Sequence, residues 1–472
     1  MSKSVTDAEI CFFEGNRHML GGEADQAETC FREAIRLAPD LSEAHANLAL
    51  LLDQAGSKTE AEEHYRRAIA CNPDIGQTYL NFGAFLANQK RFAEAEAAYQ
   101  SALKLNPNSA AAWSNLGVLQ ACRKQEKEAE NSYLRAIELD ADYKLAQFNY
   151  SYLLLRQGRY EEGWRCFEAR NWYARLEQYL ALPRWRGELL EDKSVLIGIE
   201  AGHGDMIQFC RYSALLKARG ATRIGIICHP ALKTLFSTLD SVDLVIALDE
   251  PLPSSHWDFW TPPLSVAFYC QTRLDSIPAT LPYLRADRKK LEFWAAKMCD
   301  FTGLRVGLVW KGSTSFENDA DRSLPDLETL APLSSIAGVR FFSLQKGAGE
   351  NEADNPPQGM SLVKLGPQIF DFSDTAAIVE NLDLVISVDT AVAHLAGALG
   401  KTCWILLPDY KADWRWLAER NDSPWYPGVV RLFRQPRMGD WATVIDEVRA
   451  ALQIFAGQNN CNFPGSSSEN GK

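Results

Sequence analysis

The stretch that decides the fold spans residues 382–408 and reads L-D-L-V-I-S-V-D-T-A-V-A-H-L-A-G-A-L-G-K-T-C-W-I-L-L-P. Residues 384–387 and 402–407 are short runs rich in Val, Ile and Leu, whereas residues 391–399 repeat small and apolar side chains at helical period. This pattern predicts a strand, a helix and a second strand, with Gly400 ending the helix. Because the helix joins the two strands directly, we expect them to be parallel, with a right-handed crossover.

Three polar residues of this stretch fall where parallel α/β sheets bind ligands. Asp389 and Thr390 mark the point at which the first strand ends and the helix begins. A helix N-terminus presents free N–H groups and a partial positive charge, which suit a phosphate. His394 lies one turn further along the same helix face. A second interpretation stays open, in which Thr390 only caps the helix and His394 packs against the sheet.

The motif D-T-x-x-x-H-x-A-G-A-L-G resembles the nucleotide-sugar-binding segment of GT-B glycosyltransferases, in particular those similar to bacterial heptosyltransferases. The resemblance implies two doubly wound, Rossmann-like α/β halves that face each other across a cleft. It also implies that Asp389, Thr390 and His394 bind the donor, a nucleotide sugar that acts as a co-substrate. No further cofactor is implied.

The composition describes a globular chain. The 472 residues are 46% apolar and 23% charged, which is enough material for several cores. A net charge of −12 argues against a nucleic-acid partner, which needs a basic face. Neither a membrane-spanning run nor a signal-peptide pattern is present, so we expect a cytoplasmic protein. The 11 cysteines form no C-x-x-C pair, and no D-x-D metal signature lies in a suitable turn, so no metal site is expected.

The first third of the chain repeats with a period of 34 residues. Aromatic residues recur at Phe31, Tyr65, Tyr99, Tyr133 and Phe167, and prolines recur at Pro39, Pro73 and Pro107. A 34-residue period with small residues at the helix contacts is typical of the tetratricopeptide (TPR) repeat. We therefore expect five helix pairs, stacked into an α superhelix with a concave groove.

One polar position keeps the same register, at Asn47, Asn81, Asn115 and Asn149, with Phe13 in the first repeat. The row is similar to the asparagine ladder of O-linked N-acetylglucosamine transferase, a resemblance that implies a protein or peptide bound in the groove. Each amide offers a donor and an acceptor for such a backbone. Equally open is the interpretation that these amides only connect neighbouring repeats.

Beyond the repeats, strands and helices alternate, which predicts a parallel sheet. Residues 195–200 read as a strand, followed by Gly202-His203-Gly204-Asp205 and a helix to about residue 218. This turn resembles the G-x-G-D segment of heptosyltransferase-like enzymes, which implies that Asp205 is the catalytic base. The other interpretation is that Asp205 caps the helix. His203 and Gln208 are candidates for the acceptor side, although His203 departs from the apolar residue expected there.

A second alternating region begins with a strand at residues 306–310 and continues into W-K-G-S-T-S-F-E-N-D-A-D-R-S-L-P. Polar residues follow the ends of its strands at Lys311, Ser313, Arg322, Gln345 and Lys346. In the heptosyltransferase-like pattern a basic residue near a proline contacts the donor diphosphate, and Arg322 approximately matches it. Gln345 and Lys346 follow the strand at residues 339–343, where they are placed to contact base or ribose. The open alternative for these residues is a solvated, charged loop.

These observations divide the chain into a repeat array (1–173), a linker (174–193), an acceptor-side half (194–300), a nucleotide-sugar-binding half (301–456) and a disordered tail (457–472). The combined resemblance implies a metal-independent GT-B glycosyltransferase whose TPR groove recruits a protein. Two alternatives stay open. One is a non-catalytic TPR scaffold with a degenerate GT-B domain, and the other is a sugar-nucleotide epimerase of similar fold.

Overall fold

The computed structural model describes residues 3–252, 256–301 and 303–460. The chain forms two compact units, residues 1–153 and 154–472. The boundary falls inside the helix Lys144–Arg156, so the last turn of that repeat helix belongs to the second unit. Residues 461–472 of the predicted tail lie outside the described residues, whereas its first residues, 457–460, continue the last helix.

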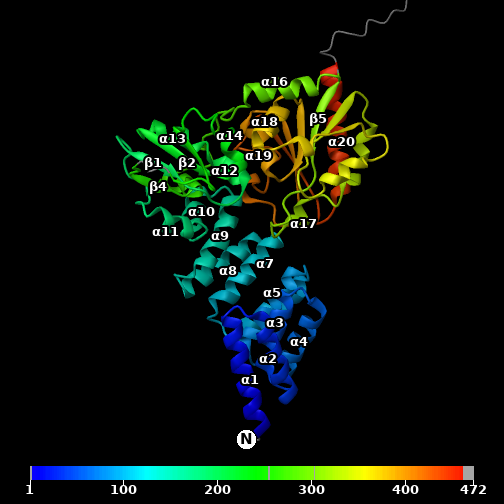
Figure 1. Ribbon diagram of the computed structural model, residues 1–472. Coiled ribbons are helices and arrows are strands. Elements are labelled where there is room, and N and C mark those ends of the chain that lie inside the picture. The colour runs from blue at the N-terminus through cyan, green and yellow to red at the C-terminus, as the bar shows by residue number, and fades with distance from the viewer. Residues whose placement is uncertain (1–2, 253–255, 302, 461–472) are drawn as a thin grey trace, which may run out of the picture. The chain divides into compact units, whose positions relative to one another are not determined.

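The first unit is built from antiparallel helix pairs (Figure 1). Its helices are α1 (Lys3–Leu20), α2 (Ala24–Leu37), α3 (Ser42–Gln54), α4 (Lys58–Cys71), α5 (Gly76–Asn88), α6 (Phe92–Leu105), α7 (Ala110–Cys122), α8 (Glu126–Leu139) and most of α9 (Lys144–Arg156). The 34-residue pattern predicted this arrangement. Glycine explains part of the close contact within each pair, because a Cβ on Gly83 would lie 2.6 Å from the ring of Tyr99 and one on Gly117 would lie 2.8 Å from that of Tyr133.

The second unit opens with α10 (Tyr160–Phe167) and α11 (Ala174–Leu180) and continues into a parallel sheet. The strands β1 (Ser194–Ile197), β2 (Arg223–Cys228), β3 (Leu244–Ala247) and β4 (Phe259–Thr261) lie in the order β3-β2-β1-β4. Helices α12 (His203–Phe209) and α13 (Tyr212–Ala218) connect β1 to β2, α14 (Lys233–Phe236) connects β2 to β3, and α15 (Val266–Tyr269) follows β4. The segment that we expected as a linker joins this sheet, since Arg184 bridges to Trp260 and Trp185 is fully buried.

A second parallel sheet contains β5 (Leu304–Val309), β6 (Val339–Ser343), β7 (Leu362–Lys364), β8 (Leu384–Val388), β9 (Cys403–Leu407) and β10 (Val430–Arg434). Their order is β10-β9-β8-β5-β6-β7. Read from β7 to β10, the chain order is 3-2-1-4-5-6 within this half, which is the doubly wound order of dinucleotide-binding sheets. Helices α16 (Arg288–Lys297), α17 (Asp319–Arg322), α18 (Phe372–Glu380), α19 (Ala391–Ala398) and α20 (Trp441–Asn460) complete this half.

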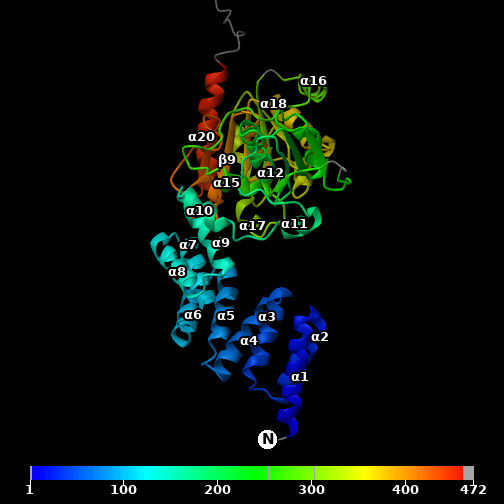
Figure 2. The same cartoon turned by 90° about the vertical axis from the view of Figure 1, so that its left-hand side faces the viewer.

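Apolar residues of α20 hold that helix on the second sheet. Val444, Val448 and Leu452 belong to one buried cluster with Val306 of β5 and Ile386 of β8. Helices α12 and α19 come from different halves and contact each other, and Figure 1 shows them side by side. The two halves are therefore in direct contact at this point. Figure 2 shows the same unit from the side, with α20 along one edge.

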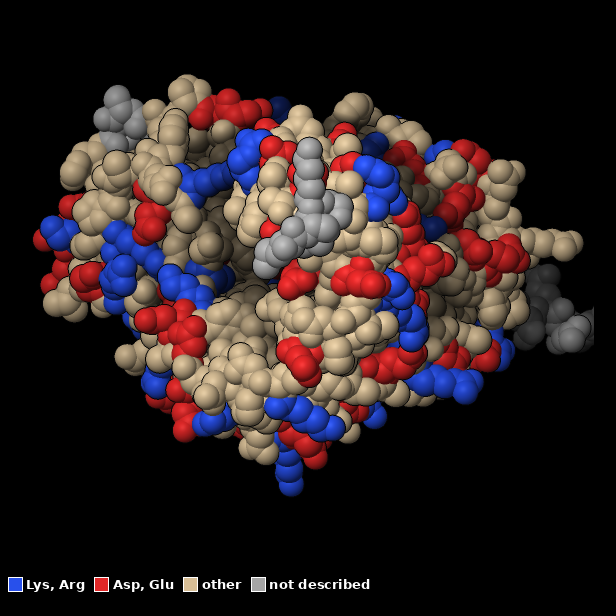
Figure 3. Space-filling view, turned by 90° about the horizontal axis from the view of Figure 1, so that it is seen from below, with Lys and Arg blue, Asp and Glu red and all other residues tan. Residues whose placement is uncertain are grey.

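Charged residues of both signs are interspersed over the face drawn in Figure 3. The excess of 12 negative charges is thus not collected into one patch on that face. Within the part of the chain that the structure describes, no helix combines the length and the apolar character that crossing a membrane requires.

Candidate functional site

The candidate site lies at the carboxyl edge of the second sheet, where the strand order reverses. Strands β5 and β8 are neighbours, and their connections leave in opposite directions, which opens a crevice at this edge. The loop beginning at Lys311 follows β5, and Asp389-Thr390 follows β8. Both predicted donor-binding segments therefore converge on this topological switch point.

Thr390 is the N-cap residue of α19, with extended backbone angles (φ −141°, ψ 170°). Its side chain does not cap the helix. Instead, the hydroxyl lies 2.9 Å from that of Ser387. The start of α19 thus keeps the character of an anion-binding helix end, since its own N-cap side chain does not occupy its N–H groups.

His394 is buried on α19 and is held from two sides. Its Nδ1 lies 2.8 Å from the hydroxyl of Tyr426, and its ring stacks on that of Trp416 with centroids 5.1 Å apart. Burial lowers the pKa of His394 well below its usual value, and the nearby charge of Arg415 lowers it further. At neutral pH His394 is therefore an uncharged group that can donate or accept one hydrogen bond.

Asp389 lies beside His394, with its Oδ1 4.0 Å from the histidine Nε2. Burial raises the pKa of Asp389 to about 6, and the carboxylate of Asp413 adds to the shift. The charges of Arg322 and Arg415 oppose this rise. Both guanidinium groups therefore lie close enough to the switch point to act on its ionisable residues.

Arg322 extends from α17 and is fixed by two neighbours. Its Nε lies 3.2 Å from Oδ1 of Asp319, and its guanidinium stacks on the ring of Phe316 at 4.2 Å. The backbone of Gly312 passes directly beside it, since a Cβ there would lie 2.5 Å from an Arg322 nitrogen. The predicted cation is thus positioned against the loop that follows β5.

The other predicted donor-side residues make contacts within the protein. Gln345 is buried, accepts hydrogen bonds from the backbone of Trp310 and Lys311 (both 3.0 Å), and donates to the carbonyls of Lys311 and Ala348. Lys311 donates to the carbonyl of Pro325 (2.8 Å) and pairs with Glu352 (3.0 Å). These contacts make Gln345 a brace for the loop after β5.

The two remaining donor-side candidates lie further along these loops. Lys346 donates to the carbonyl of Gly366 at 3.0 Å, and the hydroxyl of Ser313 lies 2.7 Å from that of Ser315. The hydrogen bond of Ser313 thus stays within the loop after β5, whereas that of Lys346 joins the loop after β6 to the segment after β7. Arg322 lies close enough to Asp389 and His394 to affect the pKa values of both.

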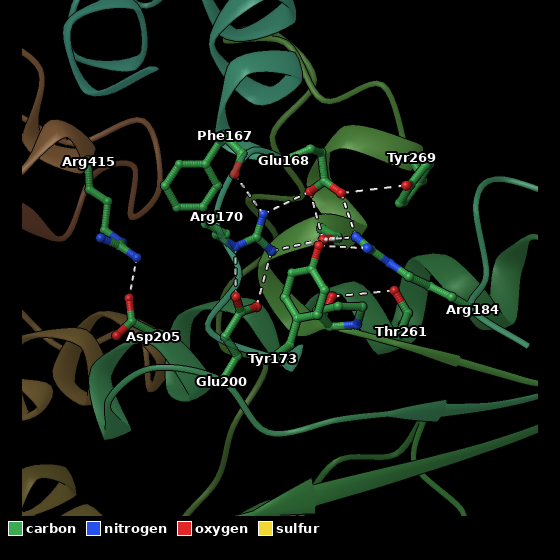
Figure 4. A network of polar contacts seen from close by, with 12 residues as sticks. Phe167, Glu168, Arg170, Tyr173, Arg184, Glu200, Asp205, Thr261, Tyr269 and Arg415 are labelled. Atoms are coloured by element: carbon green, nitrogen blue, oxygen red, sulfur yellow. Dashed lines mark hydrogen bonds and ion pairs between the residues drawn. The ribbon is translucent and has the colours of Figure 1, made fainter. Parts of the chain in front are cut away.

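Across the cleft, α12 carries the three candidates of the first half. One oxygen of Asp205 accepts the N–H of Gly202 at 2.9 Å, and the other pairs with Arg415 of the second half (Figure 4). Gln208 is fully buried, and its Oε1 also accepts from Arg415. Asp205 therefore faces the second half, and it also caps α12 as the N3 residue of a capping box whose N-cap residue is Gly202.

His203 lies in an aromatic contact between the halves. Its ring centroid is 4.4 Å from that of His229 and 5.2 Å from that of Phe372 on α18. Burial lowers the pKa of His203 to about 4, and the neighbouring His229 contributes to the shift. His203 is therefore uncharged at neutral pH.

Sequence reasoning missed Arg415, which lies in the short 3-10 helix Trp414–Trp416. Its Nη1 contacts both oxygens of Asp413 at 3.0 and 2.9 Å. The flanking tryptophans suggested only that this loop packs beneath the site. Its partner Asp205 is 210 residues away in sequence, and no local pattern reveals such a pair.

The corresponding edge of the first sheet is filled by the chain's own charged groups (Figure 4). Arg170 donates to Glu200 at 2.7 and 3.1 Å and to the hydroxyl of Ser265 at 2.8 Å. Arg184 donates to the same hydroxyl at 3.0 Å and to that of Tyr173 at 2.6 Å. Glu200 follows β1 and Ser265 follows β4, so this network occupies the switch point of the first sheet.

In the repeat unit, the four asparagines lie half-buried on α3, α5, α7 and α9. Asn47 donates to Asn16 at 2.7 Å, and Asn81 accepts from Gln77 at 2.8 Å. Asn149 donates to Ser114 at 3.4 Å. Phe13, which takes the ladder position in the first repeat, is 67% exposed.

Comparison with known proteins identifies the repeats. Two family models described as tetratricopeptide repeat match residues 14–74 with 127–163, and residues 74–142. The N-terminal region is a TPR array. Protein FlbA of Caulobacter vibrioides is 27% identical over 338 residues, which cover 67% of this chain and 56% of FlbA. The chain thus spans little more than half the length of this curated relative.

Two solved structures illustrate the structural matches. The first is pilF of Pseudomonas aeruginosa, 22% identical, covering 38% of this chain and 87% of its own, with a TM-score of 0.34. The second is a thermophilic TPR protein of Thermus thermophilus, 21% identical, covering 36% of this chain and 90% of its own, with a TM-score of 0.31.

Proposed function

We propose that this protein is a glycosyltransferase that moves a sugar from a nucleoside-diphosphate donor to an acceptor hydroxyl. The observation that carries the proposal is the contact between α12, which bears Asp205, and α19, which begins beside Thr390. The carboxylate of Asp205 thereby faces the N-terminus of α19, and the charge of Arg322 acts on Asp389 beside that N-terminus. A GT-B transferase needs this combination of groups, and two parallel sheets surround them.

In the proposed reaction Asp205 takes the proton of the acceptor hydroxyl as that oxygen attacks the anomeric carbon of the donor. Negative charge then develops on the departing nucleoside diphosphate. Arg322, Lys311 and the N–H groups at the start of α19 stabilise that charge. His394, which is uncharged at neutral pH, and Asp389 bind the donor's sugar or diphosphate by hydrogen bonds. Ser313, Gln345 and Lys346 are proposed to border the nucleotide.

We further propose that the TPR array recruits a protein acceptor or partner along the row of asparagines. The half-buried amides of Asn47, Asn81, Asn115 and Asn149 support this role, because their register repeats on alternate helices. A peptide backbone bound there would exchange hydrogen bonds with them.

A non-catalytic scaffold is the second candidate function. The observation that favours it is the pairing of Asp205 with Arg415, since this contact occupies one oxygen of the proposed base. In this alternative the TPR array binds its partner and the α/β region serves only as structure.

The first experiment is a thermal-shift screen with UDP-, ADP- and GDP-sugars. A ligand that binds only the folded state raises the melting temperature, by an amount that grows with ligand concentration. If the protein is a transferase, at least one nucleotide sugar should raise its melting temperature. If it is a scaffold, none should.

The second experiment measures transfer from the donor that the screen identifies. We expect Asp205→Asn to lower turnover by about 10²–10⁴-fold, the usual contribution of a general base. Asp275→Asn changes an exposed carboxylate and is the matched control. Equal rates for wild type and Asp205→Asn would remove the proposed base. Product analysis without an acceptor separates transfer from epimerisation.

A further inference from the structure

We infer that Arg415 is a positioning residue, which holds the carboxylate of Asp205 in the orientation that proton transfer needs. The inference rests on the proposed function, because it assigns Arg415 a part in that reaction. It goes beyond the resemblance, which implied no role for Arg415.

The first step is the geometry of Asp205. Its Oδ2 accepts the backbone N–H of Gly202 at 2.9 Å, and its Oδ1 accepts from Nη2 of Arg415. Two donors from different elements thus fix both oxygens. Each carboxylate oxygen has a second lone pair, so the pair of contacts leaves room for a substrate hydroxyl. Among the described residues, the hydrogen bond that would still restrain the side chain without Arg415 is the one with Gly202.

The second step is that Arg415 is itself immobilised. The carboxylate of Asp413 binds its Nη1 at 2.9 and 3.0 Å, and Oε1 of Gln208 accepts from its Nε. The guanidinium carbon lies 4.4 Å from the ring centre of Trp414, and only 8% of the side chain is exposed. The guanidinium is planar and has five N–H donors, so it can donate to all of these acceptors at the same time. A lysine ammonium lacks this planar arrangement of donors.

The third step is that Arg415 is not needed to hold the two halves together. Other contacts already join them, since Arg211 donates to the carbonyl of Trp425 at 2.7 Å and the N–H of Tyr283 donates to Ala398 at 3.0 Å. These contacts do not involve Asp205. Replacing Arg415 is therefore expected to leave the halves joined while it frees the carboxylate to rotate.

A double-mutant cycle tests the inference with wild type, Arg415→Gln, Asp205→Asn and the double variant, assayed with the donor found by the screen. We expect Arg415→Gln to lower kcat by about 10–100-fold, since misplacing a reacting group by about 1 Å costs up to about 10²-fold. The donor Kd should stay within about threefold of the wild-type value, because Arg415 acts on the donor-binding residues Asp389 and His394 by charge from a distance, whereas it contacts Asp205 directly. In the Asp205→Asn background, Arg415→Gln should change kcat by less than about threefold.

Two results would overturn the inference alone. One is a full additional loss from Arg415→Gln in the Asp205→Asn background, and the other is a weakened donor Kd with Asp205 intact. Either would show that Arg415 acts on the donor and not through Asp205. If wild type binds no nucleotide sugar, the proposed function fails first, and the inference fails with it.

Controls keep the cycle interpretable. Arg420→Gln alters a neighbouring, more exposed arginine that pairs with Asp422, and its kcat should match that of wild type. If Arg415→Gln does not fold, Arg415→Lys takes its place in the same cycle. Lysine keeps the charge but cannot donate from a planar guanidinium, so its kcat should fall below that of wild type and, where Arg415→Gln folds, should exceed that of Arg415→Gln.

Discussion

Gly204 and His394 touch across the cleft so closely that a Cβ at position 204 would lie 2.9 Å from Cδ2 of the histidine. The same Cβ would lie 3.4 Å from Cα of Ala391, where α19 begins. The missing side chain is therefore what lets α12 approach α19. This contact sets the distance between the proposed base and the proposed donor site.

The first prediction concerns that contact. Gly204→Ala should destabilise the second unit by about 1–3 kcal/mol, since overpacking forces neighbours off their preferred positions. Tryptophan fluorescence during thermal unfolding can measure this loss, because 12 of the 13 tryptophans follow residue 153. Gly202→Ala is the control, with its nearest contact at 3.5 Å from Asp205. Equal melting of Gly204→Ala and wild type would contradict the close approach.

The second prediction concerns the buried pair of Arg170 and Glu200, whose side chains are both fully buried. Burial raises the pKa of Glu200, and the charge of Arg170 opposes that rise. Arg170→Met should cost about 3–5 kcal/mol, because it leaves a buried carboxylate without its main partner. Arg170→Met/Glu200→Leu should cost less than the single change, since it removes both charges.

Urea unfolding of the second unit, followed by tryptophan fluorescence, provides the measurement. Arg288→Met is the surface control, because that arginine is 91% exposed and its pair with Glu292 is solvated. A double variant less stable than Arg170→Met would show that the remaining network, and not the uncompensated charge, determines the cost.

The third prediction is a pH dependence local to the second repeat. The Nε2 of His45 faces the carbonyl of Pro39 at 3.0 Å and must therefore carry a proton. The Nδ1 of His45 then accepts from that of His64, 2.8 Å away. Protonating His45 would place hydrogens on both facing nitrogens and break this bond.

Burial lowers the pKa of both histidines below 6.5, helped by Arg67 at His45 and by the partner histidine at His64. The acidic groups Asp40 and Glu60 oppose the shift. Below pH 6.5 the unfolded chain consequently binds more protons than the folded one. Stability should be full above this pH and fall as the pH decreases toward the folded-state values.

Hydrogen exchange measured by mass spectrometry, corrected for the intrinsic pH effect, can follow this loss. Peptides from α3 and α4 should lose protection as the pH falls below 6.5, whereas α5 and α6 contain no histidine and should not. In the double variant His45→Gln/His64→Gln, α3 and α4 should no longer lose more protection than α5 and α6 as the pH falls. Equal loss in all four helices would disprove a local origin.

The fourth prediction concerns the asparagine row. Replacing Asn47, Asn81, Asn115 and Asn149 with alanine should abolish capture of a partner that the wild type retains, while circular dichroism stays unchanged. The reason is that these half-buried amides supply hydrogen bonds and little of the core. Asn88→Ala/Asn131→Ala removes two exposed amides as a control. Unaltered capture by the fourfold variant would discard the ladder.

Periodic features of the fold were predictable from the sequence. The 34-residue period predicted stacked helix pairs, and the structure has such a pair at Ala110–Cys122 and Glu126–Leu139. The strand at residues 339–343 has its predicted bounds. Repetition and long apolar runs are strong local signals, so these elements need no tertiary information.

Short and long-range features were not predictable. Strands β4 and β7 have three residues each, too few to show an alternating pattern. The helix expected to reach residue 218 divides into α12 and α13, because the chain turns at Cys210 and Arg211. In the site, residues that end a strand could be found from position alone, whereas Arg415 could not.

The bridge between Arg184 and Trp260 decides where the chain can be cut. A fragment beginning at Ser194 would lack Arg170 and Arg184, and Glu200 would be left in an apolar pocket without a counter-ion. Such a fragment should express poorly or precipitate. An independent α/β fragment should start near residue 154 and carry the end of the last repeat helix with it.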